Sequence, residues 1–280
     1  MIRTVELLRA ATARLAAAGI AAPAREARLL LLHALGRADG TVLDPAMPVE
    51  PSLLNPLLER RAAREPMALI RGRQGFWTLD LAVSPATLIP RADSETLIEA
   101  ALAALPERSR VRRILDLGTG SGALLLAALS EFTAAFGIGI DIAPAALHLA
   151  RDNAQTAQLS GRTALICGSW AASIAGHFDL VLSNPPYIPT LDILRLMPEV
   201  AAHEPRAALD GGPDGLDAYR ALLVDVARLL APSGRAVLEL GVGQADDVIR
   251  LADLAGLQPA QVATDLGGID RALVLRRGDG

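Results

Sequence analysis

The feature that most constrains the fold is an alternation of strand-like and helix-like segments that begins at residue 112. Short apolar runs of strand length are separated by longer segments in which apolar residues recur with a helical period. The expected strands are 112–117, 136–141, 163–167, 179–183, 235–240, 261–264 and 271–276, and the expected helices are 122–130, 144–154, 216–230 and 244–255. Repeated strand–helix units predict an α/β fold with a mostly parallel, doubly wound sheet. The last two strands are too close for a helical crossover, so we expect them to pair antiparallel.

The beginning of the chain follows a different pattern. Apolar residues recur at helical spacing in 5–15, 24–35 and 53–58. From 72 to 83, short alternation with glycines and aromatic residues is typical of a β-hairpin. The expected parts are a helical domain over 1–71, a β-hairpin linker over 72–84 and the α/β domain over 85–280.

Composition argues against several classes of protein. The only cysteine, Cys167, excludes an internal disulfide and a cysteine-clustered metal site, and we expect no metal. No run reaches the roughly 20 apolar residues of a membrane span, and the N-terminus lacks the apolar core of a signal peptide. The net charge of −4 disfavours a general nucleic-acid binder, which is usually basic. We therefore expect a cytoplasmic protein without membrane contact or a direct nucleic-acid partner.

A glycine-rich turn follows the first strand of the α/β domain. It reads Asp116-Leu-Gly118-Thr-Gly120-Ser-Gly122, and Asp141 ends the next strand. Glycines permit a tight turn and let a ligand approach the backbone, and a carboxylate at position 141 can accept both hydroxyls of a ribose. A dinucleotide site has the spacing G-x-G-x-x-G, and an acid before it repels a pyrophosphate but attracts a cation. The plainer alternative is a tight turn with an acidic strand end.

This turn, together with Asp141, resembles the class I methyltransferase pattern. The resemblance implies a seven-stranded sheet that binds S-adenosyl-L-methionine across its carboxyl edge and releases S-adenosyl-L-homocysteine. The sulfonium and amino groups of that cofactor are cationic, which suits Asp116.

A second motif, Asn184-Pro185-Pro186-Tyr187, follows the fourth strand and therefore lies at the same sheet edge. Two prolines restrict the residue before them, so we expect Asn184 to point into the cleft. Its amide oxygen and the Pro185 carbonyl can accept two N–H bonds from a planar NH₂ group, on which Tyr187 can stack. Holding both hydrogens turns the nitrogen lone pair toward the methyl group and favours a pyramidal transition state. The alternative is a proline-rich turn without a catalytic role.

Asn-Pro-Pro-Tyr motifs resemble those of both adenine N6 and glutamine N5 methyltransferases, since both acceptors present a planar NH₂ group. Three further segments resemble the HemK/PrmC family, which methylates the glutamine of the GGQ tripeptide in peptide-chain release factors. They are 88–95 before the sheet, 198–220 after the Asn-Pro-Pro-Tyr motif, and 60–76 at the join between the helical domain and the hairpin. The resemblance covers essentially the whole chain and implies a release-factor glutamine N5-methyltransferase. It further implies direct displacement at the sulfonium methyl, the GGQ loop as the contact with the partner, and a monomeric enzyme.

The resemblance also assigns the site. The catalytic residues are Asn184, Pro185, Pro186 and Tyr187. The cofactor-binding residues are Asp116, Gly118, Thr119, Gly120, Gly122, Asp141, Ile142, Ser169, Trp170, Asn184, Arg91 and Glu95. In this scheme Asp116 and the glycines hold the methionine end of the cofactor, and Asp141 holds the ribose.

The chain departs from the family pattern at a few positions. Ala92 and Ser94 stand where the family usually has Pro and Thr, and His203 replaces an aromatic residue. The acid that the family often carries after the third strand is absent, so contact with the adenine passes to Ser169 or to backbone. Trp170 either packs on the adenine or is a structural residue.

Three alternatives stay open: a ribosomal-protein glutamine N5-methyltransferase, an adenine N6-methyltransferase of nucleic acid, and a non-catalytic cofactor-binding adaptor of the translation machinery. The run Asp93-Ser94-Glu95 favours the release-factor branch over the ribosomal-protein branch. Net acidity and the lack of a target-recognition domain disfavour nucleic acid. The intact acceptor motif disfavours the adaptor, which does not need it.

Overall fold

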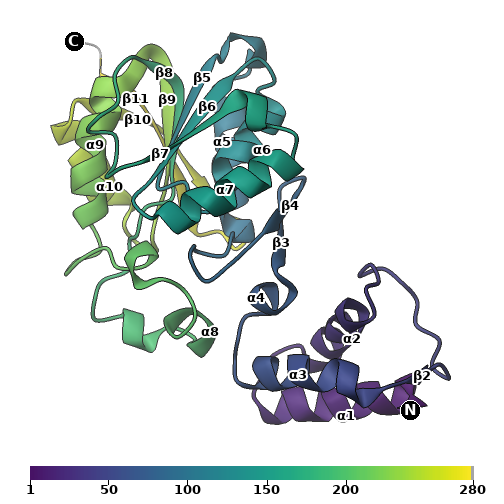
Figure 1. Cartoon of the computed structure of the whole chain (residues 1–280). Coiled ribbons are helices and arrows are strands. Elements are labelled where there is room, and N and C mark those ends of the chain that lie inside the picture. Colours follow the sequence, from purple (N-terminus) through teal and green to yellow (C-terminus); the bar gives the residue numbers. More distant parts are fainter. Residues whose placement is uncertain (279–280) are drawn as a thin grey trace. The chain divides into compact units, whose positions relative to one another are not determined.

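The computed structural model describes residues 1–278, which divide into two compact units (Figure 1). The first unit consists of Met1–Arg73 and Met197–His203, and the second of Gln74–Leu196 and the chain from Glu204 onward. The segment Met197–His203 therefore interrupts the second unit in sequence but packs with the N-terminal residues. Within residues 1–278, no helix has both the length and the apolar character needed to cross a membrane.

The first unit is built from helices that coincide with the helical periods of the sequence. Its elements are β1 (Ile2–Arg3), α1 (Thr4–Ala17), α2 (Pro23–Ala34), β2 (Pro48–Val49), α3 (Pro51–Ala62), α4 (Met67–Arg71) and α8 (Pro198–Ala201). Pro23 and Pro51 begin α2 and α3, where a missing N–H costs no helical hydrogen bond. Leu15, Leu30 and Leu54, one from each of α1, α2 and α3, are fully buried in a common apolar core.

A buried arginine on α3 connects α2 with α8. The Arg61 side chain, only 7% exposed, donates from Nε to Glu26 at 2.5 Å and from both terminal nitrogens to Glu199 at 3.2 Å. Arg64 donates to the second carboxylate oxygen of Glu199 at 2.7 Å. Removing Arg61 would leave Glu26 without this counter-charge and Glu199 with Arg64 alone, in a largely buried setting, which is costly. Arg61 therefore contributes to the stability of the first unit and holds α8 within it.

We expect Arg61→Ala to lower the free energy of opening of α1–α3 by about 3 kcal/mol, because Glu26 loses its buried partner and Glu199 keeps only Arg64. Amide hydrogen exchange along these helices measures that free energy. Arg60→Ala is the matched control, since the Arg60 side chain is 44% exposed and pairs with Glu65 at the surface. It should cost less than about 1 kcal/mol. Equal protection in the two variants would contradict the role given to Arg61.

The second unit contains one seven-stranded sheet in the order β10-β11-β9-β8-β5-β6-β7. Its strands are β5 (Arg113–Leu117), β6 (Phe136–Asp141), β7 (Thr163–Cys167), β8 (Phe178–Ser183), β9 (Leu230–Glu239), β10 (Leu257–Thr264) and β11 (Asp270–Arg277). Neighbouring strands from β7 to β9 are parallel, whereas β11 is antiparallel to both β9 and β10. The predicted fold, a mostly parallel seven-stranded sheet with an antiparallel last strand, is confirmed.

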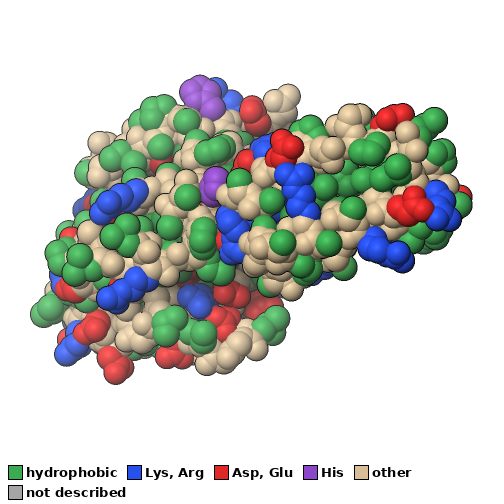
Figure 2. All heavy atoms as spheres, turned by 90° about the horizontal axis from the view of Figure 1, so that it is seen from below, with side chains coloured by type: hydrophobic (Ala, Val, Ile, Leu, Met, Phe, Trp, Pro, Cys, Tyr) green, Lys and Arg blue, Asp and Glu red, His purple; other side chains and the backbone are tan. Residues whose placement is uncertain are grey.

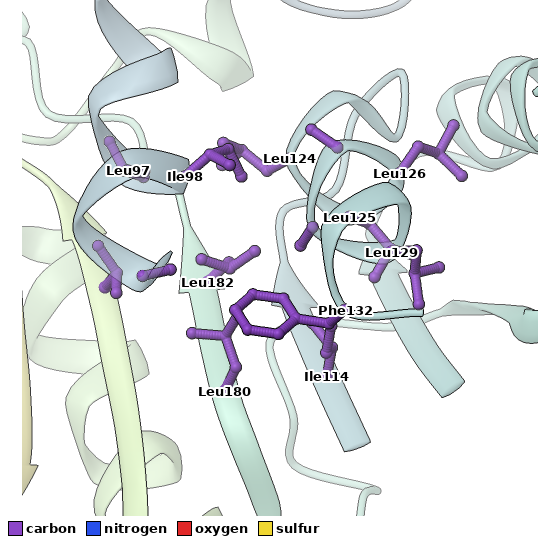
Figure 3. Close-up of a cluster of buried hydrophobic side chains, with 14 of the residues drawn as sticks. Leu97, Ile98, Ile114, Leu124, Leu125, Leu126, Leu129, Phe132, Leu180 and Leu182 are labelled. Atoms are coloured by element: carbon purple, nitrogen blue, oxygen red, sulfur yellow. The ribbon is translucent and has the colours of Figure 1, made fainter. Parts of the chain in front are cut away.

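Helices cover both faces of this sheet (Figure 1). One face carries α5 (Glu95–Ala104), α6 (Ala123–Glu131) and α7 (Pro144–Thr156); the other carries α9 (Asp217–Leu229) and α10 (Ala245–Leu254). Figure 3 shows Leu180 and Leu182 of β8 pointing toward the side chains of α5 and α6. Val181, between them, belongs to the core under α9 and α10. Alternate residues of one central strand thus complete both cores, as the period of a strand requires.

Short elements complete the second unit. A two-stranded hairpin, β3 (Arg73–Phe76) with β4 (Leu79–Ala82), lies at the predicted position. The 3-10 turns are η1 (Ala92–Ser94), η2 (Arg108–Arg110), η3 (Ser160–Arg162), η4 (Ile193–Arg195) and η5 (Arg206–Ala208).

Two strands are longer than the sequence predicts. β10 begins at Leu257 rather than 261, because Pro259 lies on an edge strand beside a register shift, where a missing N–H is tolerated. β9 begins at Leu230 rather than 235 and also contains a register shift against β8.

Charges on the face shown in Figure 2 are mixed: arginine and acidic side chains are interspersed among hydrophobic ones. A protein that binds nucleic acid through its phosphates needs a continuous basic surface. This face does not present one.

Candidate active site

The carboxyl ends of β5, β6, β7 and β8 meet at one edge of the sheet and border a cavity of about 260 Å³. Ligands of open α/β sheets bind at this edge. Most of the residues predicted for the site line the cavity: Asp116, Gly118, Thr119, Gly120, Asp141, Ile142, Ser169, Trp170, Asn184, Pro186 and Arg91. Gly122, Glu95, Pro185 and Tyr187 are not among its lining residues.

The glycine-rich turn connects β5 to α6. Gly118, Gly120 and Gly122 all have positive φ, between 54° and 82°, a region that residues with a Cβ adopt only with strain. Gly120 N donates to Asp141 Oδ2 at 2.8 Å, so the turn is fixed to the end of β6. Gly122 precedes α6 as its N-cap and serves the turn rather than the cavity wall.

Asp116 is the buried charge of the cavity. Its side chain is 1% exposed, and Oδ2 accepts a 2.6 Å hydrogen bond from the Thr119 hydroxyl. Oδ1 is buried and has no hydrogen-bond partner among the described residues. Burial, reinforced by the nearby Asp141, raises the pKa of Asp116 to about 7. An acceptor without a partner in a cavity wall fits a cationic ligand group, which would supply both the missing hydrogen bond and the counter-charge.

Asp141 has a more polar setting. Each of its carboxylate oxygens accepts a backbone N–H, from Gly120 at 2.8 Å and from Ala143 at 2.9 Å. These bonds fix the carboxylate where its remaining lone pairs can accept hydroxyl hydrogens. Ile142, Ser169 and Trp170 continue the wall beside it, and Trp170 has a positive φ of 47°. The arrangement fits a ribose on the carboxylate with a flat, apolar group next to it.

The Asn-Pro-Pro-Tyr motif leaves β8 directly into this cavity. Asn184 Nδ2 donates to Ser94 Oγ at 3.3 Å, and no described group donates to Asn184 Oδ1. Tyr187, expected to stack on the acceptor, is not among the residues that line the cavity, and its hydroxyl donates to Glu239 Oε1 at 3.1 Å. The loop that follows is packed closely on the motif, since a Cβ on Gly215 would lie 2.4 Å from the Tyr187 carbonyl oxygen. The motif is therefore held from behind by a polar group and by a glycine-dependent loop.

Arg91 and Glu95, predicted together, have separate surroundings. Arg91 lines the cavity and forms an ion pair with Glu204. Burial raises the pKa of Glu204, and the charge of Arg91 opposes that shift. Glu95 instead accepts the backbone N–H of Trp77 at 2.7 Å and so fixes the β3–β4 hairpin.

Comparisons with known proteins agree over both units. Residues 6–72 match the family described as PrmC N-terminal domain, and residues 93–208 match the methyltransferase small domain. A release factor glutamine methyltransferase of Rhodospirillum rubrum is 50% identical over 94% of this chain and 82% of its own length. Another, from Caulobacter vibrioides, is 45% identical over 97% of this chain and 96% of its own. The chain belongs to the release factor glutamine methyltransferase family.

Membership of this family confirms the predicted resemblance and makes the chain a methyltransferase. A solved methyltransferase of Pyrococcus furiosus has the same fold, with a TM-score of 0.53 at 20% identity over 71% of this chain and 89% of the other. At this identity the likeness shows the fold alone.

The structure adds three residues that the predicted site did not include. Ser94 lines the cavity beside Asn184, and Glu239, at the end of β9, accepts from both Ser94 and Tyr187. Gln244 Nε2 donates to the Tyr187 carbonyl at 3.0 Å. One signal was present in the sequence: Glu239 is an acid inside the apolar run Val237-Leu238-Glu239-Leu240, where burial calls for a partner.

Proposed function

We propose that this enzyme transfers a methyl group from S-adenosyl-L-methionine to the side-chain amide nitrogen of the glutamine in the GGQ motif of peptide-chain release factors. The observation that carries the proposal is the pairing of a buried, unpartnered carboxylate oxygen at Asp116 with a free amide oxygen at Asn184 in one cavity. The first suits a cationic cofactor and the second suits an NH₂ acceptor. The names of the relatives supply the substrate class.

The cofactor would be held by residues of the glycine-rich turn and the two strand ends. Asp116 faces its charged methionine end, Asp141 accepts from the ribose hydroxyls, and Ile142, Ser169 and Trp170 border the adenine. When bound, S-adenosyl-L-methionine supplies an electrophilic methyl group on sulfur. Arg91, fixed by Glu204, adds a positive charge to the cavity wall.

The acceptor amide would be oriented by the Asn-Pro-Pro-Tyr motif. An amide nitrogen is a poor nucleophile because its lone pair is delocalised into the carbonyl. Asn184 Oδ1, in the cavity wall, and the carbonyl of the next residue, Pro185, which is not itself among the lining residues, would each accept one of its hydrogens. This would direct the lone pair and favour the pyramidal nitrogen of the transition state. Pro186 lines the slot, and Tyr187 supports the motif from outside the cavity lining. A strong base is not needed beforehand, since the nitrogen proton becomes acidic as the new bond forms.

We further propose that residues 1–71 recognise the release factor outside its GGQ loop, that 72–84 link this helical domain to the catalytic domain, and that 85–280 carry out the transfer. Two observations support the division. Residues 6–72 match a family domain of their own, and α1–α3 have their own apolar core.

The test is to incubate the protein with methyl-labelled S-adenosyl-L-methionine and a bacterial release factor, beside a copy of the factor with the GGQ glutamine changed to alanine. Label should appear on that glutamine in peptide mass spectrometry and be absent from the altered copy. Label on a ribosomal-protein glutamine or on adenine, with the release factor unlabelled, would replace the proposal by one of the alternatives.

A further inference from the structure

A buried carboxylate lies behind the acceptor motif. Glu239 is 2% exposed, at the end of strand β9, which lies inside the sheet between β11 and β8. Oε2 accepts the Ser94 hydroxyl at 2.5 Å and Oε1 accepts the Tyr187 hydroxyl at 3.1 Å. It does not line the cavity, so it would act on the reaction only through these two neighbours.

Charged groups of both signs lie near Glu239. The guanidinium of Arg271 donates to the carbonyl of the next residue, Leu240, and its positive charge acts on the carboxylate. Burial raises the pKa of Glu239, and the two hydroxyl hydrogen bonds together with Arg271 oppose that shift. The charge of Asp93 adds to the shift caused by burial, and Arg271 also pairs with Asp265 at 3.0 Å. The acceptor role of Glu239 therefore rests on geometry: each of its carboxylate oxygens lies within hydrogen-bond distance of one hydroxyl.

The hydrogen bonds from Asn184 to Ser94 and from Ser94 to Glu239 can be given a direction by counting the hydrogens available. A serine hydroxyl has one hydrogen. The hydrogen of Ser94 points to Glu239, so Ser94 Oγ can only accept from Asn184. The Asn184 amide must therefore turn its NH₂ toward Ser94, at 3.3 Å, and its oxygen the other way.

We propose that Glu239 is a positioning residue: by taking the hydroxyl hydrogens of Ser94 and Tyr187, it fixes the Asn184 amide with its oxygen free for the NH₂ group of the substrate. This inference rests on the proposed role of Asn184. Without a carboxylate at 239, Ser94 is free to donate to Asn184 Oδ1, which would occupy the acceptor that the substrate needs. The same carboxylate fixes the ring of Tyr187.

The Glu239→Gln variant tests the proposal with little change in shape. Glutamine can accept only one of the two hydroxyl hydrogens with its oxygen and presents an NH₂ group to the other hydroxyl. We expect kcat to fall about 10- to 100-fold, the size of effect that a small misplacement of a catalytic group produces. The dissociation constant of S-adenosyl-L-methionine, measured by calorimetry, should stay within about twofold because Asp116 and Asp141 are untouched.

Two further variants separate positioning from stability. Tyr219→Phe removes a 2.6 Å hydrogen bond to the backbone carbonyl of Glu239 and leaves its carboxylate alone. It should lower the unfolding midpoint by about 2–4 °C with kcat near the wild-type value. Ser94→Ala should lower kcat on its own, and the double variant with Glu239→Gln should lose no more than the worse single variant. Independent, multiplying losses would overturn the proposal.

A readout without substrate keeps this inference separate from the proposed function. In the full-length protein with selectively labelled asparagine, the side-chain amide resonances of Asn184 are those missing from Asn184→Ala. They should shift in Glu239→Gln and Ser94→Ala but not in Tyr219→Phe. If the wild type labels no release factor, the proposed function fails and these resonances alone decide the inference. Unshifted resonances in Glu239→Gln would overturn it.

Discussion

The Asn184→Ala variant is expected to lose about 10²- to 10³-fold in kcat, the cost of deleting one well-placed polar group that stabilises a transition state. The side chain lines the cavity and keeps Oδ1 free of partners among the described residues. Alanine removes that acceptor, so one amide hydrogen of the substrate stays unheld and the lone pair is no longer directed. Initial rates of methyl transfer at saturating cofactor measure the loss.

The same variant should bind S-adenosyl-L-methionine within about threefold of the wild type. Asn184 was also expected to contact the cofactor, but the groups proposed to hold most of it belong to other strand ends. Ser183→Ala is the matched control. The neighbouring Ser183 is fully buried, donates to the Leu117 carbonyl at 2.7 Å and does not line the cavity. It should retain most of the activity. If Ser183→Ala lost as much as Asn184→Ala, the effect would come from a disturbed strand end and not from the missing acceptor.

What the sequence could predict was local. The turn from Asp116 to Gly122 is one continuous segment, and its glycines specify its backbone without help from the rest of the chain. Asp141 and Asn184 each follow a recognisable strand, and parallel strands bring their carboxyl ends to one edge. The cavity therefore contains most of the residues expected there, because each was positioned by its own strand.

What the sequence could not predict depends on distant partners. Glu239 meets Ser94 across 145 positions and Tyr187 across 52, so neither its neighbours nor its role can be inferred from the surrounding letters. Glu199 likewise finds Arg61 across 138 positions, which brings 197–203 into the helical unit. Such pairings are determined by tertiary packing, and a local sequence pattern shows only one of the two partner residues.

The second large effect is expected at Asp116. Asp116→Asn keeps an acceptor for Thr119 but removes the charge. An ion pair at about 4 Å in a partly buried site contributes up to about 4 kcal/mol, so affinity for S-adenosyl-L-methionine should fall about 10²- to 10³-fold at pH 8. Methylthioadenosine, which lacks the charged methionine end, is the matched ligand and should bind both proteins alike. Calorimetry with the two ligands measures the difference; an equal loss for both would mean that the cavity has collapsed.

The raised pKa of Asp116 also predicts in which direction cofactor affinity changes with pH. The pKa of Asp116 is raised to about 7 in the folded protein from an ordinary value of 3.8. The ionised form that attracts the cofactor is therefore lost as pH falls through 7, and wild-type affinity should be about 10-fold weaker at pH 6 than at pH 8.

The stability of the ligand-free protein changes with pH in the opposite direction. The free-energy cost of burying the ionised carboxylate of Asp116 is absent below pH 3.8, grows between pH 3.8 and pH 7, and is complete above pH 7. Asp116→Asn should thus be more stable than the wild type at pH 8, by at most on the order of 4 kcal/mol, and should bind with no such step in affinity. Urea unfolding at pH 5 and pH 8 measures the stability difference, and a variant no more stable than the wild type at pH 8 would contradict the buried charge as the source of both effects.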